Sequence, residues 1–309
     1  MLINDPPVEI SENLFMLGTS EYPLYLFQGE GEAAIFEGGV GAMGPLVLQQ
    51  MELLGIGREL VRQLVVTHAH PDHVMAVPLF REAFPGVTVS ASAAAAKTLS
   101  VEKAIGYFCK IDGALTASLT QAGRITEAHH PKPLAEPQIA VDRLIKEGDM
   151  VTVEGVSFHV LETPGHSDCS LSFHEPERGI LLVSDATSYH MPQHEFWWPD
   201  YFAGYEPYLS SMRRLAERNA EVLCLGHNAV IKGAEDVKAY FEAALEATEG
   251  YHRRIVDETK AGKSTRQIAE SLGAEVYEKT QLLPLDFFQK NCGLLVKQSL
   301  RHEGINPEK

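Results

Sequence analysis

The sequence has few cysteines and few basic residues, and it has no long apolar run. The four cysteines are scattered and form no CxxC pair, which indicates reduced thiols and not a disulfide framework. No apolar run approaches the roughly 18 residues of a membrane-spanning helix. Lysine and arginine number 26 against 42 acidic residues, for a net charge of −16. An acidic chain of this kind is not expected to bind nucleic acid or an anionic membrane.

The first ten residues, MLINDPPVEI, lack the basic and apolar segments of a secretory signal. Together with the unpaired cysteines, this predicts a cytoplasmic protein. The chain has 309 residues, 45% of them hydrophobic, which is enough for one large α/β domain or two smaller ones with a sizeable core. No short repeat or low-complexity tract interrupts it.

Strand-like and helix-like stretches alternate along the chain. Short apolar strands fill residues 1–40 and again 140–185, each set bounded by Gly, Pro and charged residues. Apolar spacing predicts helices over 45–54, 77–84, 92–123 with interruptions near Gly106 and Gly113, 207–218, and in a tail from 234. In the tail, Ser264 and Gln267 have the spacing of a capping box. The pattern favours a sandwich of two sheets with helices on its outer faces.

Metal-ligand residues follow four predicted strands. The segment THAHPDH carries three histidines and an aspartate, and TPGHSDCS, LLVSDA and LCLGHN each add one such residue. A single histidine after a strand is ordinarily a polar loop residue, but seven such residues in this order favour a metal site. Neutral imidazole and carboxylate ligands suit zinc, iron or manganese. The seven candidates are His68, His70, Asp72, His73, His166, Asp185 and His227.

The motif HxHxDH followed by separate His, Asp and His residues resembles that of the metallo-β-lactamase superfamily, over roughly residues 8–233. The resemblance implies an α/β fold, the αββα sandwich, with an active site at the sheet edge. It also implies two divalent metal ions. One would be bound by His68, His70 and His166, and the other by Asp72, His73 and His227, with Asp185 bridging the two.

Further stretches narrow the resemblance. The segments IFEGGV, FAGYEPYLSSMRRL and LLPLDFF look like those of the quinolone-signal response thioesterases of pseudomonads, which have this fold and an added C-terminal helical region. This similarity implies a catalytic domain over 1–233 and a helical extension over 234–309, which would serve as a lid or as a packing or homodimer element. It favours iron, with zinc next and manganese as a third candidate.

The chemistry implied is metal-dependent hydrolysis of a thioester or another activated ester. A metal-bound hydroxide would attack the carbonyl of a small-molecule acyl substrate, and Asp72 would orient the water or accept its proton. For the acyl pocket, residues 194–208 are rich in aromatics. The candidate pocket residues there are His194, Trp197, Trp198 and Tyr201, although the same side chains could instead pack the sandwich against the tail.

Two other functions remain open. One is a regulatory binding protein whose hydrolysis is incidental. The other is an iron-dependent redox member of the superfamily. The oxygen reductases of that kind usually have Glu in place of the second motif histidine and an attached flavodoxin domain, whereas this chain has His70 and no such domain.

Overall fold

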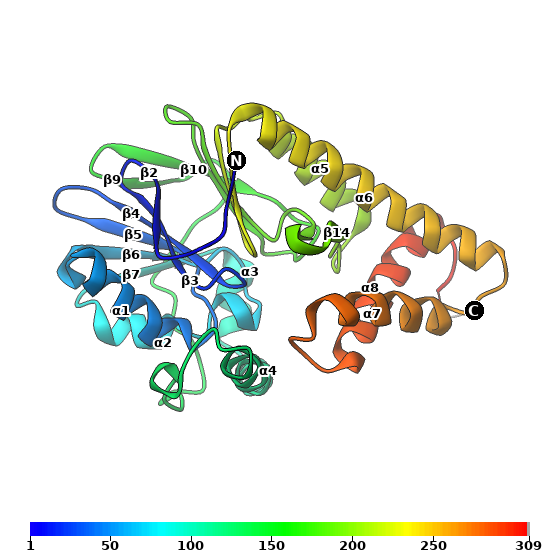
Figure 1. Ribbon diagram of the computed structural model, residues 1–309, viewed down its shortest axis with the longest axis horizontal. Coiled ribbons are helices and arrows are strands. Elements are labelled where there is room, and N and C mark those ends of the chain that lie inside the picture. The colour runs from blue at the N-terminus through cyan, green and yellow to red at the C-terminus, as the bar shows by residue number, and fades with distance from the viewer. Residues whose placement is uncertain (308–309) are drawn as a thin grey trace.

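The computed structural model describes residues 1–307 and contains two seven-stranded sheets with helices on their outer faces (Figure 1). The first sheet is antiparallel from β2 to β5 and parallel from β5 to β8. Its strands in spatial order are β2 (Val8–Ser11), β3 (Leu14–Gly18), β4 (Pro23–Gln28), β5 (Ala33–Phe36), β6 (Val61–Val65), β7 (Thr88–Ala91) and β8 (Arg143–Leu144).

The second sheet comes mainly from the later part of the chain and is antiparallel except between β12 and β15. Its strands in order are β1 (Leu2–Ile3), β16 (Val230–Lys232), β15 (Val222–Leu225), β12 (Ile180–Ser184), β11 (Leu171–Glu175), β10 (Val156–Glu162) and β9 (Met150–Val153). A separate ribbon pairs β13 (Tyr189–Met191) with β14 (Phe196–Trp198).

Strand β4 shows how the layers are held together. Its side chains alternate, so Tyr25 and Phe27 enter the core between the two sheets, while Leu24 and Leu26 face the core under the helices. The Phe27 ring meets Phe158 of β10 edge to face, with centroids 5.3 Å apart, which joins one sheet to the other. Because both faces of β4 are buried, the strand reads as a continuous apolar run.

Helices cover both outer faces, as the two-sheet pattern predicts. Those near the first sheet are α1 (Met43–Leu54), α2 (Val77–Ala83), α3 (Ala93–Leu99) and α4 (Glu102–Gln121). Those against the second sheet are α5 (Tyr205–Ala216) and α6 (Ala234–Lys260). Four short 3-10 helices complete the connections: η1 (Arg58–Leu60), η2 (Pro71–His73), η3 (Glu127–His129) and η4 (Pro192–His194). None of the helices described is long and apolar enough to cross a membrane.

The expected interruptions near Gly106 and Gly113 are wrong. Helix α4 runs through both glycines, and the break falls earlier, between α3 and α4. Both glycines lie on the exposed side of the helix, where each costs only about 1 kcal/mol relative to alanine. Burial of Phe108 and Leu115 on the opposite side offsets that cost.

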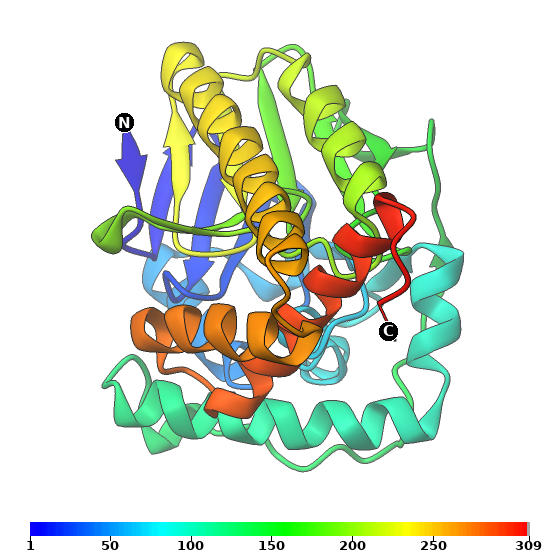
Figure 2. The same ribbon diagram turned by 90° about the vertical axis from the view of Figure 1, so that its right-hand side faces the viewer.

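The tail forms a hairpin of α7 (Thr265–Thr280) and α8 (Leu285–His302), which follows α6 (Figure 2). The capping box at its start is confirmed, because the Ser264 hydroxyl accepts from the Gln267 amide and the Gln267 side chain accepts from the Ser264 amide. The two helices cross closely at Gly273, where a Cβ would lie 2.5 Å from the Cα of Gln289. Buried residues of the hairpin belong to the same hydrophobic cluster as residues of the sheets and of the helices that cover them.

Candidate metal centre

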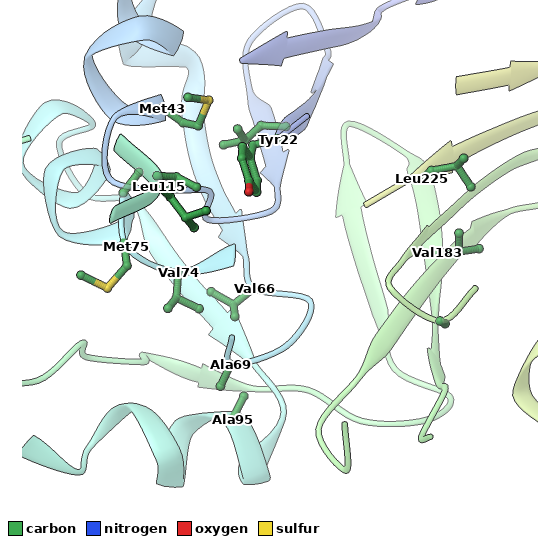
Figure 3. Packing of buried hydrophobic residues seen from close by; sticks show 14 of the residues in the cluster. Tyr22, Met43, Val66, Ala69, Val74, Met75, Ala95, Leu115, Val183 and Leu225 are labelled. Carbon is green, nitrogen blue, oxygen red and sulfur yellow. The ribbon is translucent and has the colours of Figure 1, made fainter. Parts of the chain in front are cut away.

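Buried aliphatic side chains fix the strand ends that carry the candidate ligands. Figure 3 shows Val66, which directly follows β6, and Val183 and Leu225, which lie near the ends of β12 and β15 on the second sheet. Both sheets therefore present rigid strand ends at one common edge. A predicted ligand follows two positions after each of these three residues: His68, Asp185 and His227.

All seven predicted ligands meet at this edge, although they come from loops after β6, β10, β12 and β15. They form two groups whose ligand atoms lie within 4.8 Å of one another. The first group is His68, His70, His166 and Asp185, and the second is Asp72, His73 and His227.

Asp185 lies between the two groups. Its Oδ2 is 3.3 Å from Nε2 of His166 in the first group and 3.3 Å from Nε2 of His73 in the second. Its Oδ1 is 3.3 Å from Nε2 of His227. Asp72 belongs to the second group, and its Oδ2 lies 3.5 Å from Nε2 of His73 and 3.7 Å from Nε2 of His227. One carboxylate thus faces both groups, as a bridging ligand would.

The loop after β5 supports this arrangement through a close backbone approach. The Gly38 amide donates to the carbonyl of His73 at 2.9 Å, and a Cβ on Gly38 would lie 2.5 Å from that oxygen. Neighbouring Glu37 has φ 84°, an uncommon left-handed conformation for a residue other than glycine. The Glu37 carboxylate accepts from the Thr67 hydroxyl at 2.9 Å and lies 2.8 Å from Nδ1 of His73. These bonds hold the strained turn.

Each of three further histidines is oriented through its Nδ1. His166 Nδ1 lies 3.1 Å from the Asp200 carboxylate and 3.0 Å from its carbonyl, and His227 Nδ1 lies 2.7 Å from the carbonyl of Glu21. His68 Nδ1 lies 3.2 Å from the Thr67 hydroxyl. Such partners fix the tautomer and ring direction of metal-binding histidines.

Among the buried side-chain atoms of the described residues that lack a hydrogen-bond partner, two belong to the predicted ligands: Nε2 of His68 and Nε2 of His73. An unpaired buried polar atom is costly, and in a native protein it calls for a missing partner. Both atoms point into the cluster, one in each ligand group. The residues present therefore fit a divalent transition metal, held by imidazole nitrogen and carboxylate oxygen.

Burial and the neighbouring charges shift the pKa values of the ionisable groups in the cluster. Burial lowers the pKa of His70 to about 3 and holds the pKa of His68 well below its usual range. For His166, burial acts in the same direction, but Asp200 and Asp185 outweigh it and raise the pKa to about 9. Burial opposes ionisation of Asp185, yet the surrounding imidazoles hold its pKa well below the usual value. A metal cation would take the place of the protons that now balance these carboxylates.

A cavity of about 240 Å³ opens over the cluster. Its polar end includes Asp72, Asp185 and His227, and its walls come from α4, the segment around Trp198, and the α7–α8 hairpin. Tyr22 and Tyr189 flank His227 at this end, with ring centroids 5.4 and 4.8 Å away.

Of the four candidate pocket residues, the structure places Trp198 at this cavity. Trp197 instead stacks on His190, with ring centroids 3.9 Å apart. Tyr201 is buried and shares a hydrogen bond with the Ser299 hydroxyl at 2.9 Å, and His194 is exposed in η4. These three do not line the cavity, so most of the aromatic stretch packs the sandwich against the tail.

Sequence reasoning missed Asp200, which orients His166, and the hairpin residues of the cavity wall. It used Glu37 only as part of the segment IFEGGV, with no role assigned to its side chain. Asp200 follows two tryptophans and a proline with no motif around it, and it lies 34 residues from His166. No local signal identifies it.

Two sheets, helices outside them and a cluster of potential metal ligands at the sheet edge define an α/β sandwich with a candidate metal centre. The Metallo-beta-lactamase superfamily model matches residues 23–227, and the chain belongs to this superfamily. The expected fold is confirmed, with the helices α6–α8 after the sheets.

Similar proteins agree with this assignment. The hydroxyacylglutathione hydrolase of Legionella pneumophila (strain Paris) is 26% identical over 125 residues, which are 40% of this chain and 33% of that protein. The hydroxyacylglutathione hydrolase of Cereibacter sphaeroides is 27% identical over 158 residues, 51% of this chain and 44% of that protein. The matched part thus spans less than half the length of either relative.

Solved structures extend the likeness of fold. A metallo-beta-lactamase family protein from Thermus thermophilus superposes with a TM-score of 0.61 at 22% identity, covering 98% of this chain and 94% of that one. The metallo-beta-lactamase MIM-1 from Novosphingobium pentaromativorans gives a TM-score of 0.57 at 23% identity, covering 84% and 92%.

Proposed function

We propose that the protein is a hydrolase with two divalent metal ions that cleaves a thioester or another activated ester. The observation that carries this proposal is the position of Asp185 between two ligand groups, each with an unpaired buried Nε2 atom. The first ion would be held by His68, His70 and His166, the second by Asp72, His73 and His227, and Asp185 would touch both. Iron or zinc would suit this set, and manganese is a third candidate.

The bound ions would supply positive charge that polarises the substrate carbonyl and lowers the pKa of a water molecule. The chain's own residues do the rest. Asp72 lies at the cavity with 24% of its side chain exposed, so it can orient the attacking water and accept its proton. Water adds to the carbonyl carbon, the carbon–sulfur or carbon–oxygen bond breaks, and the products are a carboxylic acid and a thiol or alcohol.

Thioester hydrolysis is favoured among these reactions because curated relatives at 26–27% identity are named hydroxyacylglutathione hydrolases. The resemblance to the signal-response thioesterases favours the same chemistry and a lid formed by the tail. The hairpin at the cavity supports such a lid. We also propose a cytoplasmic protein with a small-molecule acyl substrate. All seven ligands come from one chain, so the centre needs no partner even if the protein forms a homodimer.

Metal analysis combined with a substrate panel tests the proposal. Protein purified without added metal, then reconstituted with iron, zinc or manganese, is expected to bind two equivalents and to hydrolyse at least one acyl thioester or lactone. Binding of no metal after reconstitution would overturn the metal centre. Full occupancy without turnover of any ester would instead favour the regulatory binding protein.

A further inference from the structure

The walls of the cavity are apolar over most of their extent. Helix α4 contributes Phe108, Ile111 and Leu115, and the hairpin contributes Leu283, Phe287 and Phe288. None of the lining residues within the described chain is lysine or arginine. The charged groups at the cavity are carboxylates and histidines. All of them lie at its polar end, beside the predicted metal ligands, which is called the metal end below. An anionic ligand group would find no cation to pair with along these walls.

The wall is held in place by contacts between segments that are far apart in sequence. The Trp198 and Phe288 rings meet with centroids 5.7 Å apart. Gln298 of α8 donates to the carbonyl of Phe202 at 2.8 Å, next to the Tyr201–Ser299 hydrogen bond. Figure 2 shows the hairpin next to the long α4 helix. These contacts fix the hairpin to residues 198–202, the segment after Asp185 that begins at the end of β14. The apolar wall is therefore preformed.

The size of the cavity limits what fits. A pocket for a drug-sized ligand has roughly 300–1,000 Å³, and this one has about 240 Å³. A short acyl chain or a single aromatic ring fits that space, whereas a large thiol carrier has to stay outside it. Burial of an ionised carboxylate without a partner is far more costly than burial of a methyl group.

We propose, building on the hydrolase function above, that the cavity selects an uncharged apolar acyl or aryl group and rejects acyl groups with a distal carboxylate. The metal end takes the reacting carbonyl. Helix α4 and the α7–α8 hairpin take the rest of the acyl group, and the thiol portion leaves toward solvent.

The test compares two thioesters of N-acetylcysteamine, a small neutral thiol. The hexanoyl and adipoyl groups have the same number of carbons, but adipoyl ends in a carboxylate. We expect kcat/KM for the hexanoyl thioester to be at least about 100-fold higher, as for a charge buried without a partner. Equal kcat/KM for the two thioesters, within about threefold, would overturn the proposal.

Two matched variants locate the selectivity on the hairpin. Leu294 and Leu285 both lie on α8 and are both 38% exposed, but only Leu294 lines the cavity. Leu294→Arg is expected to raise kcat/KM for the adipoyl thioester at least about tenfold and so narrow the preference. Leu285→Arg adds the same charge outside the cavity and should leave the ratio unchanged. An unchanged ratio in a folded Leu294→Arg protein would show that α8 does not set selectivity.

A binding arm separates this inference from the hydrolase function. Hexanamide and the monoamide of adipic acid mimic the two acyl groups without an ester to cleave, and calorimetry measures their binding. Binding of hexanamide but not of the charged amide, with no thioester hydrolysed, would support the apolar selectivity of the cavity and overturn the hydrolase function. Tighter binding of the charged amide would overturn the proposed selectivity. This arm also decides the case if Leu294→Arg fails to fold.

Discussion

The two ends of the cavity differ in how they are built. At the metal end, side chains from four loops are fixed by strands of both sheets and by hydrogen bonds to residues such as Glu37 and Asp200. At the apolar end, the wall comes from one face of α4 and from a helical hairpin near the end of the chain. The metal end carries the side chains that could take part in the reaction. The apolar end can act on a substrate only through its shape and its lack of charged groups. Changes at the two ends should therefore affect different kinetic constants.

The largest effect is expected from Asp185→Ala, which removes the carboxylate between the two ligand groups. Loss of a residue that only orients a ligand lowers metal affinity about 10–100-fold, and loss of Asp185, which we propose contacts both ions, should exceed that. Metal content after dialysis and kcat are the measurements. We expect occupancy to drop and turnover to reach background. Normal occupancy and turnover would show that Asp185 is not a ligand.

Asp72→Asn should separate turnover from metal binding. The amide keeps one oxygen for the metal but cannot accept a proton, so kcat should fall about 10²- to 10⁴-fold while the first ligand group is unchanged. Asp286→Asn, on the exposed surface of α8, is the matched control and should behave as wild type. Near-normal kcat in fully loaded Asp72→Asn protein would contradict the role drawn for Asp72.

Glu37→Gln tests the support of the metal end. The amide can still hydrogen-bond His73 and Thr67, but it loses the charge that holds the imidazole. Metal affinity should decrease about 10–100-fold, measured by competition with a chelator, and the hexanoyl-to-adipoyl ratio should stay constant. A changed ratio with unchanged affinity would mean that the two ends are not independent.

The smallest effect on turnover is expected from Asp112→Asn, which changes a contact between α4 and the loop after β5. Asp112 lies on α4 beside the wall, and its carboxylate accepts from the Gly41 amide at 2.6 Å. Burial raises the pKa of Asp112 from 3.8 to about 6, against the opposing effect of the Gly41 hydrogen bond.

Between pH 3.8 and 6 the folded state therefore binds more protons at Asp112 than the unfolded state, and stability falls as pH rises through this window. Above pH 6 the loss in the free energy of unfolding caused by Asp112 is constant, with an upper limit of about 3 kcal/mol. Asp112→Asn should unfold at a higher urea concentration than wild type at pH 8, and the gain should shrink toward pH 4. A gain in the unfolding urea concentration that does not depend on pH would contradict the raised pKa of Asp112. The kcat should not change.

Much of the metal end could be predicted because its signal is local. Four of the predicted ligands lie within six residues: His68, His70, Asp72 and His73. The β-branched stretch before them predicts a strand that ends where these residues begin. The helix ranges also followed from apolar spacing. The predicted breaks at Gly106 and Gly113 were wrong, because packing of the buried face of α4 outweighs the modest cost of exposed glycine.

The sequence by itself determined which residue types follow the strands, and hence the kind of chemistry the edge can perform. Only the tertiary structure decided what surrounds that chemistry. Trp198 reaches the cavity while its neighbour Trp197 does not, because adjacent residues of β14 point to opposite sides. The wall exists because α7 and α8 approach closely at Gly273 and α8 binds the segment around Phe202. The hydrogen bonds of α8 to Tyr201 and Phe202 join residues 98 and 96 positions apart, and no local spacing encodes which surfaces meet.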